Sequence, residues 1–238
     1  MRAYRILHVD DEPDIREIVE LCLGLDPAFV VRGCGCGRDA LAIAAEWSPD
    51  LILCDVMMPD MDGPTMLARL HECPGTAGVP VVFMTARAQK RELEQFKSLG
   101  AVGVLAKPFD PMTLGEAVRC HLRAAGLAAL RSGFIGRMRT DAERLAECRQ
   151  RLRQGASSSQ ALEEIKSFAH ALVGAAGIFA FQRVSCAASS LELHAGEALA
   201  GRDTAGKVER ELDALLDCIA HVETAGAGPQ ASRAVAAG

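Results

Sequence analysis

Five short apolar runs alternate with helical periods over the first half of the chain, and this alternation limits the fold more than any other feature. The apolar runs are predicted strands, near 4–9, 29–33, 50–55, 80–85 and 102–106. The segments between and after them repeat their apolar residues at helical spacing, which predicts helices near 13–25, 37–47, 63–72, 89–99 and 111–125. Strands that alternate with helices in this way form a parallel sheet covered on both faces. The sequence therefore predicts an α/β, doubly wound, five-stranded parallel sheet.

Ionisable and hydroxyl side chains stand where the predicted strands end. Asp10 and Asp11 follow the first strand, Asp55 ends the third, Thr85 ends the fourth and Lys107 follows the fifth. Ligands of open parallel sheets bind beyond the carboxyl ends of the strands, so these side chains are expected to meet at one edge. Three carboxylates there repel one another and favour a hard cation, and Mg²⁺ suits them because it leaves room for phosphate oxygens. With Thr85 and Lys107 holding the other phosphoryl oxygens, the predicted chemistry is phosphoryl transfer onto Asp55.

Residues 1 to about 124 resemble the receiver domain of bacterial response regulators, which has a flavodoxin-like fold. The resemblance rests on five positions in register, since Asp11 lies 44 positions before Asp55, and Thr85 and Lys107 lie 30 and 52 positions after it. It implies that Asp55 is the phosphoacceptor and that Lys107 precedes a proline in a cis peptide. It also implies the Mg²⁺ ligands, which are Asp10, Asp11, Asp55 and the backbone carbonyl of Met57.

Val104 departs from the pattern of that family. Receivers commonly have an aromatic residue three positions before the lysine, and it turns inward when the threonine hydroxyl moves to the phosphoryl group. Valine has few rotamers and a short reach. The response to phosphorylation is therefore expected to run through Thr85 and the segment 86–99, or through contact with the second half of the chain.

After Gly126 the strand pattern stops and four helical periods follow, near 129–154, 160–178, 181–200 and 205–223. Amphipathic helices joined by short loops predict an all-α, antiparallel four-helix bundle. The expected organisation is a first domain over 1–124, a short linker over 125–132 that a continuous helix could span, the bundle over 133–224 and a flexible tail over 225–238.

His170 lies one position off the apolar stripe of the second bundle helix, so it is rotated by about 100° and is expected to reach solvent. The glycines Gly174 and Gly177 follow it, although a glycine inside a helix costs about 1 kcal/mol relative to alanine. A bare backbone lets another protein approach, and an accessible imidazole is a competent nucleophile toward an acyl phosphate. From the helix alone, a surface histidine without a role is the simpler interpretation.

Residues 160 to about 195 resemble histidine phosphotransfer (HPt) domains, four-helix bundles whose exposed histidine exchanges phosphate with receiver aspartates. The resemblance rests on the His-x-Leu-x-Gly sequence that begins at His170, on the small residues after it, and on the later Leu191-Glu192. It implies that His170 is a second phosphoacceptor, with a docking surface formed by Lys166, Val173, Gly174 and Gly177. Val173 stands where the family commonly has lysine, so the phosphohistidine is expected to be less stable than in a lysine-bearing relative.

Charge and hydropathy limit the classes of partner and the cellular location expected for the chain. The formal charge of −5 lies in residues 1–126, which hold 13 Lys and Arg against 18 Asp and Glu, whereas 127–238 hold 13 of each. That balance does not indicate a nucleic-acid partner. No apolar run reaches the ~18 residues of a membrane span, and Met1 leads directly into a predicted strand, so a cytoplasmic protein is expected.

Two functions follow from these observations. In the first, the chain is a two-component phosphorelay protein in which Asp55 takes phosphate from a partner and His170 exchanges phosphate with a receiver. The partners would be a sensor histidine kinase, other receivers or other HPt proteins, because the sequence has no Gly-x-x-x-x-Gly-Lys-Ser/Thr loop for ATP. In the alternative, phosphorylation of Asp55 switches a bundle that only docks a partner, and His170 stays unphosphorylated. The sequence leaves the direction of phosphate flow and the oligomeric state open.

Overall fold

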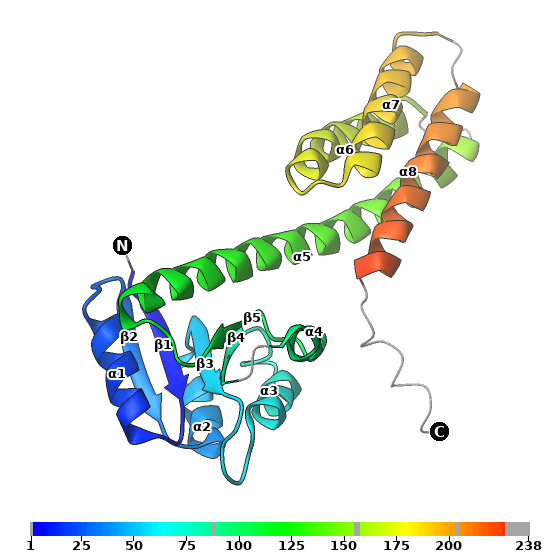
Figure 1. Cartoon of the computed structure of the whole chain (residues 1–238). Helices are drawn as coiled ribbons and strands as arrows, with labels where there is room; N and C mark the ends of the chain where they lie inside the picture. Colours follow the sequence, from blue (N-terminus) through cyan, green and yellow to red (C-terminus); the bar gives the residue numbers. More distant parts are fainter. Residues whose placement is uncertain (1, 87–88, 155–157, 203–204, 227–238) are drawn as a thin grey trace, which may run out of the picture. The chain divides into compact units, whose positions relative to one another are not determined.

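The computed structural model describes residues 2–86, 89–154, 158–202 and 205–226 (Figure 1). The chain divides into two compact units, 1–128 and 129–238, which are described separately. The boundary falls within one helix, α5 (Pro111–Arg153). Across the described ranges, none of the helices has the length and apolar character that crossing a membrane requires.

The first unit is built on a five-stranded sheet in which every neighbouring pair of strands is parallel, in the order β2-β1-β3-β4-β5. The strands are β1 (Tyr4–Val9), β2 (Phe29–Cys34), β3 (Leu51–Asp55), β4 (Val81–Thr85) and β5 (Gly103–Ala106). The helices are α1 (Pro13–Gly24), α2 (Gly37–Trp47), α3 (Gly63–Glu72), α4 (Lys90–Ser98) and the first part of α5. The predicted α/β fold is confirmed, and the ends of these strands and of α1 to α4 differ from the predicted ones by no more than one residue.

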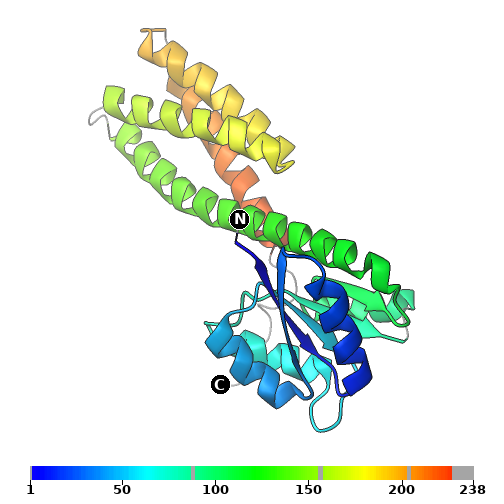
Figure 2. The same cartoon turned by 90° about the vertical axis from the view of Figure 1, so that its left-hand side faces the viewer.

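Alternate residues of the strands face opposite layers of helices (Figures 1 and 2). Ile6, Leu53 and Met84 belong to a buried cluster that contains side chains of α1 and α5. Leu7 and Phe83 belong to the cluster on the other face, with side chains of α2, α3 and α4. Both faces of the sheet are therefore buried, which explains why its strands are apolar runs rather than alternating ones.

The second unit is helical, as predicted. It contains the second part of α5, α6 (Ser158–Ile178), α7 (Gln182–Leu199) and α8 (Ala205–Gly226). The helices predicted at 111–125 and 129–154 form one helix, so the 125–132 linker lies inside α5. The predicted tail begins two residues too early, because α8 ends at Gly226, and 227–238 lie outside the described residues.

One apolar cluster holds the second unit together, with contributions from all four helices. On α6 the buried members are Ile165, Ala169, Leu172 and Ala176, which are the predicted stripe, and Leu162 packs against them half-buried. Because this stripe turns inward, the adjacent face of α6, which carries His170, is turned to solvent.

Candidate functional site

The carboxyl edge of the sheet brings together the side chains that the sequence places at the strand ends. Asp10 follows β1 and is fully buried, while Asp55 and Thr85 end β3 and β4 and are each 7% exposed. Lys107 follows β5, and its backbone N–H donates to the carbonyl of Thr85 at 2.7 Å. Parallel pairing of β1, β3, β4 and β5 in that order therefore lines up the four residues along one edge.

Lys107 lies between two carboxylates. Its Nζ is 2.7 Å from Oδ2 of Asp10 and 2.5 Å from Oδ1 of Asp55. Burial by itself lowers the pKa of Lys107, but hydrogen bonds and charge interactions with Asp10 and Asp55 outweigh burial, so the pKa is raised above its usual value of 10.5. The ammonium therefore stays charged at neutral pH. The peptide between Lys107 and Pro108 is cis, as the family resemblance implied.

Backbone amides hold the remaining oxygens of the two carboxylates. The N–H of Glu12 donates to Oδ1 of Asp10 at 3.0 Å, and the N–H of Met57 donates to Oδ2 of Asp55 at 2.7 Å. Next to them α3 begins at Gly63, where a Cβ atom would lie 2.6 Å from the carbonyl oxygen of Asp55. Glycine is required there because no other residue allows α3 to start so close to β3.

His8 of β1 is fully buried behind this edge. Its Nε2 is 3.7 Å from Oδ2 of Asp10, and neither ring nitrogen has a hydrogen-bond partner among the described residues. Burial lowers the pKa of His8 to about 4, despite the opposing charge of Asp10. The imidazole is therefore neutral at physiological pH and does not compete with Lys107 for the carboxylate.

Asp11 differs from the other two carboxylates among the predicted metal ligands, Asp10 and Asp55, because its side chain is exposed. Within the described ranges, no three His, Cys, Asp or Glu side chains are close enough together to hold a metal ion. The chemistry of the donors still fits Mg²⁺, since two buried carboxylates, an exposed carboxylate next to them in sequence and a backbone carbonyl at Met57 are all hard oxygen ligands.

A cavity of about 420 Å³ opens beside Asp55. The cavity is lined by Thr85, Lys107, Met57 and Glu12, and by Glu92 and Phe96 of α4. The sequence patterns did not indicate Glu92 or Phe96 as site residues. Val104 on β5 is half-buried and packs against the apolar cluster that contains Phe83. The contribution of α4 depends on how that helix packs on the sheet, and no spacing rule in the sequence reveals it.

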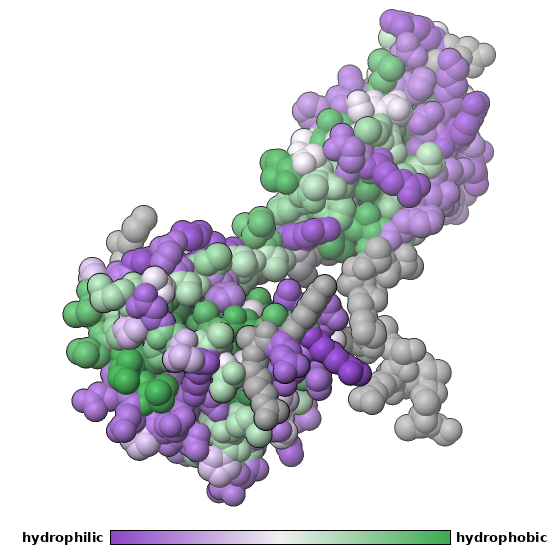
Figure 3. All heavy atoms as spheres, in the orientation of Figure 1, coloured by the Kyte–Doolittle hydropathy of each residue, from purple (hydrophilic) through white to green (hydrophobic). Residues whose placement is uncertain are grey.

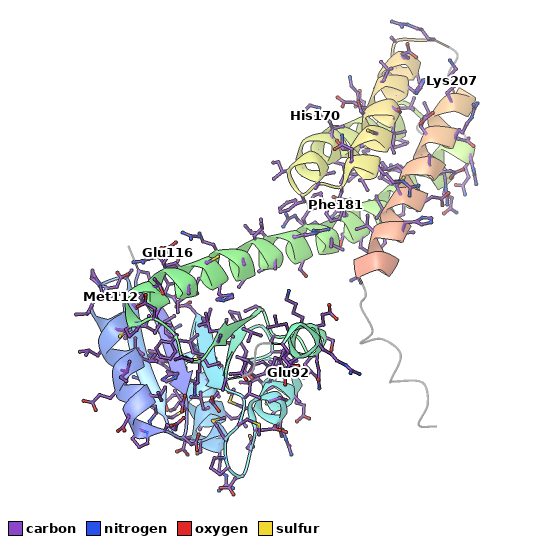
Figure 4. The ribbon with its side chains drawn as sticks, in the orientation of Figure 1. Glu92, Met112, Glu116, His170, Phe181 and Lys207 are labelled. Carbon is purple, nitrogen blue, oxygen red and sulfur yellow. The ribbon has the colours of Figure 1, made fainter. Side chains whose placement is uncertain are left out.

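The second candidate site surrounds His170 on α6 (Figure 4). Its side chain is 79% exposed, which confirms the expected position at the surface. Its Nδ1 lies 2.9 Å from Oε1 of Glu192 on α7. Because a carboxylate only accepts hydrogen bonds, this contact requires a proton on Nδ1, and in the neutral imidazole it leaves the lone pair of Nε2 free to act as a nucleophile. Glu192 belongs to the Leu191-Glu192 motif, but no sequence pattern predicts this contact, which joins residues 22 positions apart.

The surface around His170 has little side-chain cover. Among the described residues, a Cβ atom at Gly174 would meet nothing within 4 Å, and one at Gly177 would meet only Ser185 Oγ, at 3.9 Å. Packing against the described part of the chain therefore does not explain these glycines. Val173 is half-buried against the core.

Lys166 stands one turn before His170 and is the only lysine or arginine of α6. It lines a cavity of about 440 Å³ together with Glu192. A Cβ atom at Gly196 of α7 would lie 3.8 Å from its Nζ, which places the ammonium against α7. Of the four residues expected to form a docking surface, the structure therefore exposes Lys166, Gly174 and Gly177 and partly buries Val173.

Comparisons with known proteins match both halves of the chain. Residues 6–119 match the response regulator receiver domain and residues 136–225 match the Hpt domain. The DNA-binding dual master transcriptional regulator RpaA of Synechocystis is 37% identical over 119 residues, 50% of this chain and 49% of RpaA. An uncharacterized 14.6 kDa protein of Leptolyngbya boryana is 33% identical over 119 residues, which cover 50% of this chain and 90% of that protein.

The chain spans half or less of the first curated relatives it matches. Among solved structures, the chemotaxis protein CheY4 of Vibrio cholerae is 31% identical, with a TM-score of 0.47, over 49% of this chain and 97% of that one. The receiver match at 6–119 lies in the first unit, and the Hpt match at 136–225 lies in the second. The chain therefore belongs to the two-component phosphorelay proteins, with a response regulator receiver domain followed by an Hpt domain.

Proposed function

We propose that Asp55 accepts a phosphoryl group and that His170 exchanges one with the aspartate of a receiver domain. The observation that carries the proposal for the second half is the His170–Glu192 contact, because it leaves Nε2 of an exposed imidazole available. A bundle that only docked its partner would not need an oriented, exposed imidazole. The pairing therefore favours exchange over the docking alternative.

At Asp55, a carboxylate oxygen attacks the phosphorus of a partner phosphohistidine or of a small acyl phosphate. A P–O bond forms to Asp55, and the bond from phosphorus to the donor nitrogen or oxygen breaks. Lys107 pairs with a phosphoryl oxygen and offsets part of the new charge, since its ammonium already lies 2.5 Å from Asp55. Thr85, which lines the same cavity, donates a hydrogen bond from its hydroxyl group to another phosphoryl oxygen.

Mg²⁺ is the cofactor proposed for this step, held by Asp10, Asp11, Asp55 and the backbone carbonyl of Met57. When bound, it neutralises charge that carboxylates and phosphoryl oxygens bring together. Asp10 and Asp55 contribute fixed oxygens because backbone N–H groups orient both of them. Asp11 would turn inward from its exposed position.

At His170, Nε2 attacks the phosphorus of an aspartyl phosphate, a P–N bond forms and the carboxylate leaves. Glu192 keeps the proton on Nδ1 during the transfer, so the reactive nitrogen faces solvent, where a partner can reach it. The open space at Gly174 lets a receiver bring its aspartate close to the imidazole.

The partners proposed are histidine kinases and other receiver or HPt proteins. Apolar surface is visible at the left of Figure 3, over the side of the receiver domain where α1 lies. Ile18, Leu21 and Leu25 are 40%, 67% and 77% exposed there. Ile18 and Leu21 lie three positions apart on one face of α1, which begins next to Asp10 and Asp11, and Leu25 is the residue at the C-terminal cap of this helix. Such a face fits a partner helix that delivers phosphate to Asp55.

Two labelling experiments on the full chain test these roles. Labelled acetyl phosphate with Mg²⁺ should label wild type but not Asp55→Asn, and chelation of Mg²⁺ should abolish the label. Phosphoramidate should give an acid-labile label that His170→Gln removes and Asp55→Asn keeps. Equal labelling of Asp55→Asn by acetyl phosphate would refute the first assignment, and persistence of the acid-labile label in His170→Gln would refute the second.

A further inference from the structure

Glu92 places a carboxylate in the cavity beside Asp55. It belongs to the first turn of α4, and it lines the cavity together with Asp55, Thr85 and Lys107 (Figure 4). Its Oε2 atom is buried and has no hydrogen-bond partner among the described residues. Buried carboxylate oxygens normally have a donor, so this one calls for an explanation.

The described cations around the cavity do not supply that donor. Among the lining residues that the structure describes, Lys107 is the only Lys or Arg, and its ammonium is bonded to Asp10 and Asp55. Glu12 adds a further carboxylate to the wall. A phosphoryl group on Asp55 would therefore enter a space in which the charge of Glu92 is not compensated. Like charges in a partly desolvated cavity repel more strongly than in water.

The helix that carries Glu92 has few apolar contacts to the sheet. Phe96 is its only buried member among the described side chains, and its ring lies 5.0 Å from that of Phe83. Leu93 is half-buried, and the other side chains described on α4, apart from Glu92, are exposed. Elements with few buried apolar contacts open at a low cost in free energy. Repulsion that acts on α4 therefore displaces this helix more easily than it displaces the sheet.

We propose that Glu92 opposes the phosphoryl group on Asp55 and thereby drives the first turn of α4 away from the cavity when the receiver domain is phosphorylated. The inference rests on the proposed phosphorylation of Asp55 and adds the side chain that makes α4 respond to it. Valine at position 104 leaves no aromatic side chain on β5 to respond. Glu92, in the same cavity as Asp55, supplies the force instead, and Phe96 is the contact about which α4 moves.

The test compares the full-length wild type with Glu92→Gln in the presence of Mg²⁺ and beryllofluoride, whose BeF₃⁻ group stands in for the phosphoryl group on Asp55. The amide has nearly the same shape as the carboxylate, removes its charge and replaces one acceptor oxygen with an NH2 donor. Glu94→Gln is the matched control, because Glu94 is an exposed residue of the same helix. Titration calorimetry measures the affinity for beryllofluoride, and hydrogen exchange measures how fast the amides of α4 exchange. The exchange rates of β1 and β3 show whether each variant is folded.

Glu92→Gln should bind beryllofluoride about fivefold more tightly, a factor typical of removing one like charge at a partly exposed site. Beryllofluoride should speed exchange in α4 of the wild type and of Glu94→Gln, and should do so much less in Glu92→Gln. Equal affinities of Glu92→Gln and wild type, an equal gain in Glu94→Gln, or equal responses of α4 would each overturn the inference. If wild type itself bound no beryllofluoride, or bound it independently of Asp55, the phosphoacceptor assignment would fail first and the inference with it.

Discussion

Replacing Lys107 by methionine should destabilise the receiver domain and make its stability depend on magnesium. The substitution keeps most of the side-chain volume and removes the ammonium from between Asp10 and Asp55. The lysine and Asp55 side chains are 14% and 11% exposed and that of Asp10 is fully buried, so this is a buried ion pair rather than a surface one. Removing one partner of a buried pair costs about 3–5 kcal/mol. We expect about 3 kcal/mol, the lower end of that range, because the side chains of Lys107 and Asp55 keep some contact with solvent.

Trp47 makes the assay specific to one domain. It is the only tryptophan of the chain and lies at the end of α2, so its fluorescence during urea unfolding reports the receiver domain and not the Hpt domain. Lys97→Met is the matched control, because Lys97 is exposed on α4 and its substitution should change the free energy of unfolding by less than about 0.5 kcal/mol. Magnesium should stabilise Lys107→Met more than wild type, because the metal replaces the missing positive charge.

The pH dependence follows from the raised pKa of Lys107. A group whose pKa is higher in the folded protein contributes stability that is fully present below its unfolded pKa, here 10.5, and is lost as the pH rises through the folded value. The difference in free energy of unfolding between wild type and Lys107→Met should therefore be constant from pH 7 to 9 and shrink above pH 10.5. A loss at pH 7 no larger than that of Lys97→Met, or equal magnesium stabilisation of both chains, would refute the buried-pair reasoning.

Three further predictions concern the Hpt domain. Glu192→Ala should slow phosphorylation of His170 by about fivefold, which corresponds to ~1 kcal/mol for a charged contact with an exposed partner. The control Glu163→Ala, on the exposed side of α6, should leave the rate unchanged, and equal rates for the two variants would show that Glu192 does not orient the imidazole. Val173→Lys should shift the equilibrium toward phosphohistidine by tenfold or less, the factor that 1.4 kcal/mol represents. The label on His170 after mixing with a phosphorylated receiver measures this shift, and an unchanged distribution of label between His170 and the receiver would refute the role assigned to a cation at position 173. Gly174→Gln should slow transfer from a receiver while circular dichroism stays unchanged, because a Cβ atom there meets none of the described residues within 4 Å, and an unaffected rate would place the docking surface elsewhere.

The sequence was sufficient for features that depend on local periodicity. Apolar runs of strand length, separated by helical periods, predicted the α/β fold and put Asp10, Asp55, Thr85 and Lys107 at strand ends. In a parallel sheet all strand ends of one kind meet at the same edge, so sequence position alone predicted that these residues come together. The exposure of His170 followed for a similar reason, since a helix turns by about 100° per residue and the apolar stripe fixes which face is buried.

Tertiary packing decided the contacts between elements that no local period relates. Whether Glu192 reaches His170 depends on the register of α7 against α6, and a shift of one turn would place another residue beside the imidazole. Glu92 and Phe96 enter the Asp55 cavity only because α4 packs on the sheet next to β4 and β5. The sequence determined which groups are available for phosphoryl chemistry, and the packing of helices determined which of them lie close enough to orient or oppose one another.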